Sequence, residues 1–276
     1  MATLTIGLAT SHLAAITRTP EDEDTSQIAN FRAGFRTLSA ALHAAEPDVA
    51  IILSPDHVNR FFLDNMPAFC IGLFDSFRGP AERNTGMPDR EVPSDPALAG
   101  HLLNHGLEHG VDFARAEEWV VDHGFMVPLY MLDREARIPV VPIHVNCAAP
   151  PYPGIARCYD VGTMLRDAIA AWPVDKRVAV IAAGGLSHSP GDARMGQIDA
   201  AFDRDFLTRL ESGHRDRLTS LTNEAIDATG SSTAEIRTWI VLAGIFAEQG
   251  FRRVTYESID AWVTGCGQCI VGNRTP

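Results

Sequence analysis

Three histidines of this chain come directly after short apolar segments. His12, His57 and His188 follow residues 4–9, 49–53 and 178–183, in that order. Each segment is a continuous apolar run, the pattern of a β-strand that is buried on both faces. If these strands are parallel, their carboxyl ends meet at one edge of a sheet, where α/β folds place their sites. Imidazole binds metals and exchanges protons near neutral pH, so the spacing predicts a metal or acid–base site at that edge.

Two further residues, His123 and Glu235, could belong to such a site, but each also fits a purely structural role. His123 lies in Asp122-His123-Gly124, where Asp122 suits a turn. Glu235 closes the sequence Ser232-Thr-Ala-Glu, which matches a helix capping box whose Glu reaches back to the cap amide. From residue types alone, the capping role is favoured for Glu235.

The motifs around these residues resemble those of a known enzyme family. They are SPDHVNRFF at 54–62, MPAFCIG at 66–72, VDHGFMVPL at 121–129, GGLSHSP at 184–190 and EIRTW at 235–239. Together they resemble the class III extradiol ring-cleavage dioxygenases, the superfamily of the protocatechuate 4,5-dioxygenase catalytic subunit. Within it they are most similar to the 2,3-dihydroxyphenylpropionate 1,2-dioxygenases. The likeness runs from His12 to about Trp262.

This resemblance implies an oxidoreductase that holds non-haem Fe(II) with His12, His57 and Glu235. Two histidines and a carboxylate form the facial triad of such enzymes. The resemblance also implies that His123 and His188 carry protons, and His188 is the expected base. A small aromatic diol, an aminophenol or a dihydroxypyridine would react with O2. A catechol would give a muconic semialdehyde-type product, as in the catabolism of aromatic compounds.

Several alternatives stay open at this point. A metal-dependent hydrolase on the same fold and a non-catalytic binding protein of the family are the two rival functions. The presence of all three ligands and both proton-carrying histidines argues against the binding protein. The ring substituent is not determined, although Arg60, Arg78 and Arg83 are candidates for pairing with a substrate carboxylate.

Composition restricts the class of protein. The chain has 276 residues, is 46% hydrophobic and carries a net charge of −12, with no basic run. This charge argues against a nucleic-acid partner. No apolar stretch is long enough to span a bilayer, and the N-terminus does not have the pattern of a signal peptide. Five cysteines without regular spacing favour a reducing compartment, so a cytoplasmic protein without membrane contact is expected. The family likeness suggests a homo-oligomer and leaves a separate small subunit possible.

The elements that must position these residues follow from periodicity. Helices are expected at 26–46, 95–110, 158–171 and 232–249, with helical character over 198–228, and a further strand at 138–145. Ser94 is a candidate cap for the second helix. Residues 14–25 and 75–98 indicate loops, and 250–276 an irregular tail. The resemblance implies an α/β fold, a single three-layer α/β/α domain over 1–276 with a mixed central sheet of the phosphorylase/hydrolase-like type.

Two other groups are assigned no function. His101, His105 and His109 repeat every four residues, a spacing that can chelate a metal, but a polar helix face explains them better. Cys266 and Cys269 form a lone CxxC without the context of a zinc or redox site, and two free thiols in a C-terminal loop are expected.

Overall fold

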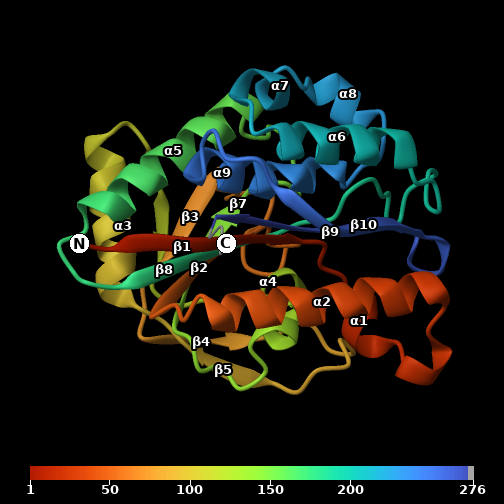
Figure 1. Cartoon of the computed structure of the whole chain (residues 1–276), viewed down its shortest axis with the longest axis horizontal. Coiled ribbons are helices and arrows are strands. Elements are labelled where there is room, and N and C mark those ends of the chain that lie inside the picture. The colour runs from red at the N-terminus through yellow and green to blue at the C-terminus, as the bar shows by residue number, and fades with distance from the viewer. Residues whose placement is uncertain (273–276) are drawn as a thin grey trace.

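A mixed β-sheet forms the centre of the structure, a computed structural model that describes residues 1–272 (Figure 1). Its eight strands are β1 (Thr3–Thr10), β2 (Val49–Ser54), β3 (Phe69–Gly72), β6 (Ala114–Ala116), β7 (Val140–Val145), β8 (Arg177–Ala183), β9 (Arg252–Ile259) and β10 (Thr264–Gly272). They lie in the order β6-β3-β7-β2-β8-β1-β10-β9. A separate hairpin consists of β4 (Ser76–Gly79) and β5 (Arg90–Pro93).

The four middle strands β7, β2, β8 and β1 run parallel to one another. β10 pairs with β1 in the antiparallel sense, and β9 pairs with β10 in the same way. On the other side β3 is antiparallel to β7. The expected mixed sheet is therefore confirmed, and the three histidine-terminated strands are neighbours within its parallel part.

Helices cover both faces of the sheet (Figure 1). They are α1 (Ala14–Arg18), α2 (Ser26–Ala44), α3 (Pro96–Glu108), α4 (His123–Leu132), α5 (Ile155–Ala171), α6 (Ala200–Ser212), α7 (Arg215–Thr219), α8 (Asn223–Asp227) and α9 (Ile236–Ile245). Short 3₁₀ turns η1 (Glu21–Glu23), η2 (Thr233–Glu235) and η3 (Asp260–Trp262) complete the elements. α3, α5 and α9 share one apolar cluster, and α1, α2 and α4 share the other.

β2 shows why the sheet is buried on both faces. Val49, Ile51 and Leu53 pack into the cluster of α5 and α9. Ala50 and Ile52 point the other way, into the cluster of α2 and α4. Alternate side chains of a strand face opposite sides of a sheet, so a strand covered by helices on both sides must be apolar throughout. The continuous apolar run thus encodes the three layers, and the α/β/α fold is confirmed.

Several sequence expectations on local structure are wrong. The stretch 250–272 is not irregular, because it forms β9 and β10 and closes one side of the sheet. The expected loop at 75–98 contains the β4–β5 hairpin, and 14–25 contains α1 and η1. Asp95, rather than Ser94, caps α3 by accepting a hydrogen bond from the Leu98 amide. Cys266 and Cys269 are free as expected, but they lie buried in β10 and not in a loop.

Other boundaries differ by smaller amounts. The helix expected at 158–171 begins at Ile155, and the one expected at 232–249 is η2 followed by α9. The helical character over 198–228 is divided among α6, α7 and α8. The expectation of one domain over 1–276 includes 273–276, which lie outside the described residues.

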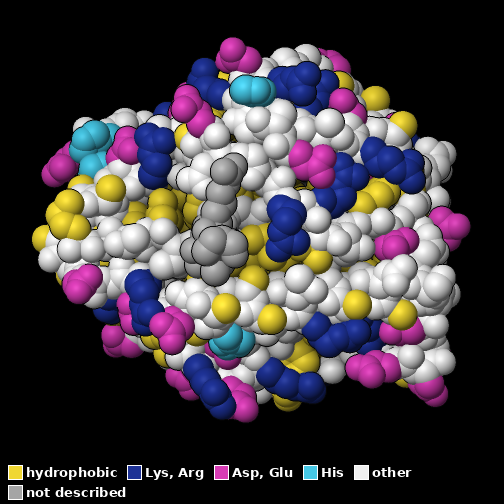
Figure 2. Space-filling view, viewed as in Figure 1, with side chains coloured by type: hydrophobic (Ala, Val, Ile, Leu, Met, Phe, Trp, Pro, Cys, Tyr) yellow, Lys and Arg dark blue, Asp and Glu magenta, His cyan; other side chains and the backbone are white. Residues whose placement is uncertain are grey.

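The surface has no strong segregation of charge on the face drawn in Figure 2, where acidic and basic side chains are interspersed. Among the described residues, no helix combines the length and the apolar character that crossing a membrane requires.

Candidate active site

The carboxyl ends of β1, β8 and β2 meet at one edge of the sheet and bring the predicted histidines together. The amide of Gly184, just after β8, donates a hydrogen bond to the carbonyl oxygen of Thr10 at the end of β1 (3.1 Å). His12 and His188 therefore leave adjacent strands at the same level. His57 comes from the loop after β2, which is the other neighbour of β8. This convergence is the one that the strand pattern predicts.

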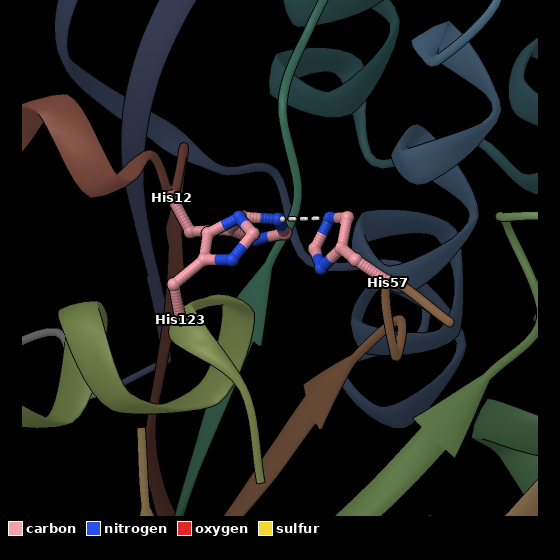
Figure 3. Close-up of side chains that lie close together, drawn as sticks. All are labelled: His12, His57 and His123. Carbon is pink, nitrogen blue, oxygen red and sulfur yellow. Dashed lines mark hydrogen bonds between the residues drawn. The ribbon is translucent and has the colours of Figure 1, made fainter. Parts of the chain in front are cut away.

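His12, His57 and Glu235 bring two ring nitrogens and the two oxygens of one carboxylate close together. The Nε2 atoms of His12 and His57 are 3.2 Å apart, a contact drawn in Figure 3. Glu235 Oε1 lies 3.3 Å from His57 Nε2, and Glu235 Oε2 lies 3.4 Å from His12 Nε2. Ligand bonds of about 2.1 Å that meet near a right angle place their donors about 3 Å apart. The three residues therefore fit one metal ion as a facial group.

Glu235 is held in this position by the loop after β8. The backbone N–H of Gly185 donates a hydrogen bond to Glu235 Oε2. A Cβ on Gly185 would lie 2.5 Å from His188 Cε1, and one on Gly184 would lie 2.5 Å from the Glu235 carbonyl oxygen. Only glycine permits this close approach. Ser232 makes no side-chain cap, so the capping-box explanation of Glu235 is wrong.

His57 is oriented by Asp122, which is fully buried. One carboxylate oxygen, Asp122 Oδ2, accepts hydrogen bonds from the ring Nδ1 (2.8 Å) and from the backbone N–H of His57 (2.6 Å). Asp122 also caps α4 through Gly124. With Nδ1 bonded in this way, Nε2 is the nitrogen that is free to bind a metal, as in carboxylate–histidine–metal triads. Asp122 is thus more than the turn residue that the sequence suggested.

His123 is the first residue of α4 and stacks on His57, with ring centroids 4.3 Å apart. One ring nitrogen from each of His12, His57 and His123 lies within 4.8 Å of the others (Figure 3). The Nδ1 of His123 donates to Glu82 Oε1 (2.6 Å). The ring centroid of His123 is 5.7 Å from that of His12, so His123 adjoins both candidate metal-binding histidines.

His188 lies on the other side of Glu235. Its Nδ1 donates to the backbone carbonyl oxygen of Leu186 (2.8 Å), so Nε2 carries the lone pair. That Nε2 is 3.7 Å from Glu235 Oε1. The loop is anchored behind the ring by Asp203, which accepts hydrogen bonds from the amide and the hydroxyl of Ser187 (both 2.8 Å) and from the hydroxyl of Tyr256 (2.8 Å).

Burial and charge set the protonation states in the centre. Burial lowers the pKa of His12 to about 3. Burial also acts to lower the pKa of His57, but the Asp122 and Glu235 carboxylates outweigh it and raise that pKa well above its usual value. Burial opposes ionisation of Glu235, yet the neighbouring His12 and His188 hold its pKa below its usual range. The imidazole of His12 is therefore neutral and the carboxylate of Glu235 is ionised, which are the forms that bind metals.

The remaining sequence candidates lie elsewhere. His101 Nε2 bonds to the Ala168 carbonyl oxygen (2.8 Å), and the rings of His105 and His109 stack on each other. These three belong to no metal-binding group of the described residues. Arg83 lines an open cavity of about 490 Å³ next to Glu82, whereas Arg60 lines a different cavity with Arg115.

Three polar residues of the site were not identified from the sequence. Glu82 lies in a segment without periodicity, and its contact with His123 is purely tertiary. Asn59 connects the two carboxylates, because its Nδ2 lies 3.1 Å from Glu82 Oε1 and 3.4 Å from Asp122 Oδ2. Asp203 lies in the helical stretch 198–228, where a charged residue usually faces solvent. The only available signal was for Asn59, which lies within the motif of His57.

Comparison with known proteins agrees with this geometry. The family model described as the catalytic LigB subunit of aromatic ring-opening dioxygenase matches residues 7–266. A 2,3-dihydroxyphenylpropionate/2,3-dihydroxicinnamic acid 1,2-dioxygenase from Burkholderia vietnamiensis is 30% identical, over 96% of this chain and 98% of that protein. One of the same name from Paraburkholderia phymatum is 31% identical, over 93% and 95%.

A crystal structure supports the fold alone. An uncharacterized protein from Escherichia coli K12 superimposes with a TM-score of 0.65 at 14% identity, over 97% of this chain and 100% of that one. The family match covers both ends of the site, from before His12 to beyond Glu235. The chain belongs to the LigB family of aromatic ring-opening dioxygenases and is an enzyme of the class III extradiol type.

Proposed function

We propose that this enzyme is a non-haem Fe(II)-dependent dioxygenase that cleaves a catechol-type ring beside its diol and gives a muconic semialdehyde-type product. One observation carries the proposal. The Nε2 atoms of His12 and His57 lie 3.2 Å apart, each lies 3.3 to 3.4 Å from one oxygen of the Glu235 carboxylate, and one further histidine adjoins each side of this group. A facial triad leaves coordination positions open for a diol and for oxygen.

His12, His57 and Glu235 would hold the iron. Bound there, iron would supply a Lewis acid that lowers the pKa of a coordinated hydroxyl, together with positions for two reactants. Other residues of the protein hold these ligand side chains in fixed orientations. Asp122 fixes the ring of His57, and the amide of Gly185 fixes the carboxylate of Glu235.

His188 is the proposed base. The Leu186 carbonyl oxygen holds its Nδ1–H, so Nε2 is free to accept the proton of a substrate hydroxyl beside Glu235. The ring is nearly buried, with 8% of its side chain exposed, which limits competition from water.

His123 is the proposed acid. Its Nδ1 is bonded to Glu82, so Nε2 is the atom from which a proton would pass to the reacting oxygen. A carboxylate behind an imidazole stabilises the imidazolium form that must deliver this proton. The two histidines therefore divide the proton transfers that ring cleavage requires.

The comparisons support the dioxygenase over its rivals. The matching family model is described as an aromatic ring-opening dioxygenase and both relatives are named as dioxygenases, which favours this function over the metal-dependent hydrolase and the non-catalytic binding protein. The two relatives are named for 2,3-dihydroxyphenylpropionate, so that compound belongs first in a panel of catechols, aminophenols and dihydroxypyridines. Arg83, beside Glu82, is the arginine that we propose to test for contact with a substrate carboxylate.

The structure of the product tests the proposal. After anaerobic loading with Fe(II) and addition of O2, a catechol should yield a product heavier by one O2. Its nuclear magnetic resonance spectrum should show cleavage next to the two hydroxylated carbons. Cleavage between those carbons, giving a dicarboxylic acid, would contradict the extradiol assignment. A Zn(II)-loaded sample is the matched control and should form no ring-cleaved product.

A further inference from the structure

The carboxylate of Glu82 accepts two separate hydrogen bonds from His123. Its Oε1 accepts from the ring Nδ1 of His123 (2.6 Å), and its Oε2 accepts from the backbone N–H of the same residue (3.0 Å). That amide opens α4, where amides have no partner within the helix and a carboxylate is favoured by the helix dipole. One side chain therefore fixes both the backbone and the ring of His123.

The segment around Glu82 is anchored at both ends. The amide of Ala81 donates to the Val121 carbonyl oxygen (2.8 Å), and the Val121 amide donates to the Arg78 carbonyl oxygen (2.9 Å). These bonds place residue 82 beside residues 122 and 123. Further on, the hydroxyl of Thr17 donates to the Thr85 carbonyl oxygen (2.6 Å). Hydrogen bonds on both sides of Glu82 thus hold its backbone next to His123.

Glu82 is also connected to the proposed metal ligands. The Nδ2 of Asn59 lies 3.1 Å from Glu82 Oε1 and 3.4 Å from Asp122 Oδ2, and Asp122 holds the ring of His57. The rings of His57 and His123 stack at an interplanar angle of 26°. One hydrogen-bonded chain of side chains therefore fixes the two stacked rings relative to each other.

We propose that Glu82 is a positioning residue for His123. It selects the tautomer with the proton on Nδ1, turns Nε2 toward the reacting atoms and stabilises the imidazolium when Nε2 takes up a proton. This inference rests on the proposed function, in which His123 carries a proton, and it assigns a catalytic contribution to the segment between the hairpin strands β4 and β5. Burial opposes ionisation of Glu82, but the hydrogen bond from His123 outweighs it and lowers the pKa of Glu82.

The tautomer can be measured without metal or substrate. In metal-free protein labelled with ¹⁵N-histidine, the chemical shifts of the two ring nitrogens report which of them carries the proton. The resonances of His123 are assigned by their loss in His123→Ala. We expect Nδ1–H in the unaltered chain and in Glu82→Gln, which keeps an acceptor, but a mixture of both tautomers in Glu82→Ala. The same pure Nδ1–H state in Glu82→Ala would overturn the proposal, whatever reaction the enzyme catalyses.

Kinetics of the iron-loaded enzyme separate positioning from simple folding. Removal of a residue that orients a site group typically costs 10- to 100-fold. Glu82→Ala should lower kcat by about that factor, with KM and bound iron within twofold of the unaltered enzyme, and Glu82→Gln should lose less. In a His123→Ala background the same change should cost nothing more. An equal further loss in that background would overturn the proposal, because Glu82 would then act elsewhere.

Asp89→Asn is the matched control. Asp89 lines the same cavity as Glu82 and its change removes the same charge, but it does not bond to His123. Unchanged kcat and tautomer in this variant would support the proposal. A loss as large as that of Glu82→Ala would contradict it, because a general effect of charge would then explain both.

Discussion

The two sides of the centre hold their histidines in different ways. On one side, the Nδ1 of His123 is bonded to a carboxylate, Glu82, and 21% of its side chain is exposed. On the other side, the Nδ1 of His188 is bonded to a neutral backbone carbonyl, and 8% of its side chain is exposed. The same residue type is thus given an anionic partner in one place and a neutral one in the other. We propose that each ring exchanges protons through its Nε2, His123 with an anionic partner on Nδ1 and His188 with a neutral one.

The largest effect should come from the ligands that both sides share. His12→Ala or Glu235→Ala removes one of three donors, so iron bound after anaerobic loading and desalting should fall from about one equivalent to background. Metal analysis measures this directly. His109→Ala, on the exposed end of the α3 histidine stripe, is the control and should keep its iron. Full iron retention in Glu235→Ala would exclude Glu235 as a ligand.

The next largest effect distinguishes the two histidines. His188→Ala should keep iron and substrate binding but lose about 100-fold or more in kcat, because a general base typically contributes 10²- to 10⁴-fold. His123→Ala should also be slow. Since His123 is the more exposed ring, added imidazole should restore His123→Ala better than His188→Ala. Normal turnover of His188→Ala would show that the base is assigned to the wrong residue.

A smaller loss of kcat is expected from changes at Asp203, which holds the loop that carries His188. Asp203→Asn replaces one of the oxygens that hold Ser187 and so loosens the loop that aims His188. We expect kcat to fall about tenfold, because small displacements of a positioned group are costly. Tyr256→Phe removes one hydrogen bond from the same carboxylate and should lose less. If both variants kept full kcat, the Asp203 contacts would matter for stability alone.

The buried carboxyl of Asp203 also predicts a pH-dependent stability. Burial raises its pKa from 3.8 to about 6. The folded protein therefore holds the proton more tightly than the unfolded chain, so this stabilisation is present below about pH 4 and is lost as the pH rises through about 6. The difference in unfolding free energy between the unaltered chain and Asp203→Asn should fall by about 3 kcal/mol over that range. Denaturant titrations at several pH values measure it, and a flat difference would contradict the shift.

The sequence predicted the part of the site in which the histidines follow the parallel strands β1, β2 and β8. Residues 49–53 are apolar because both faces of β2 are covered, so the strand and the position of His57 after it were evident locally. β10 was missed because its glycines and polar residues resemble a loop. Those residues are buried by pairing with β1, a partner more than 250 residues away in the chain. A long-range pairing of this kind has no local pattern.

The roles of Glu235 and Glu82 could not be predicted from local residue patterns. The capping-box pattern at Ser232 gave the wrong role for Glu235, because the Gly185 amide, 50 residues away, binds its carboxylate instead. Family resemblance was needed to identify it as a candidate ligand. Glu82 had neither a local pattern nor a recognised motif, and only the tertiary bonds of Ala81 bring it to His123.

Oxygen consumption by the iron-loaded enzyme is the most direct test of the proposed dioxygenase activity. The enzyme is purified without oxygen, loaded with one equivalent of Fe(II), and mixed with O2 and a panel of catechols that includes 2,3-dihydroxyphenylpropionate. We predict oxygen uptake matched mole for mole by a yellow ring-fission product, and neither signal when zinc replaces iron. No uptake with any diol, or equal product formation with zinc or without metal, would contradict it.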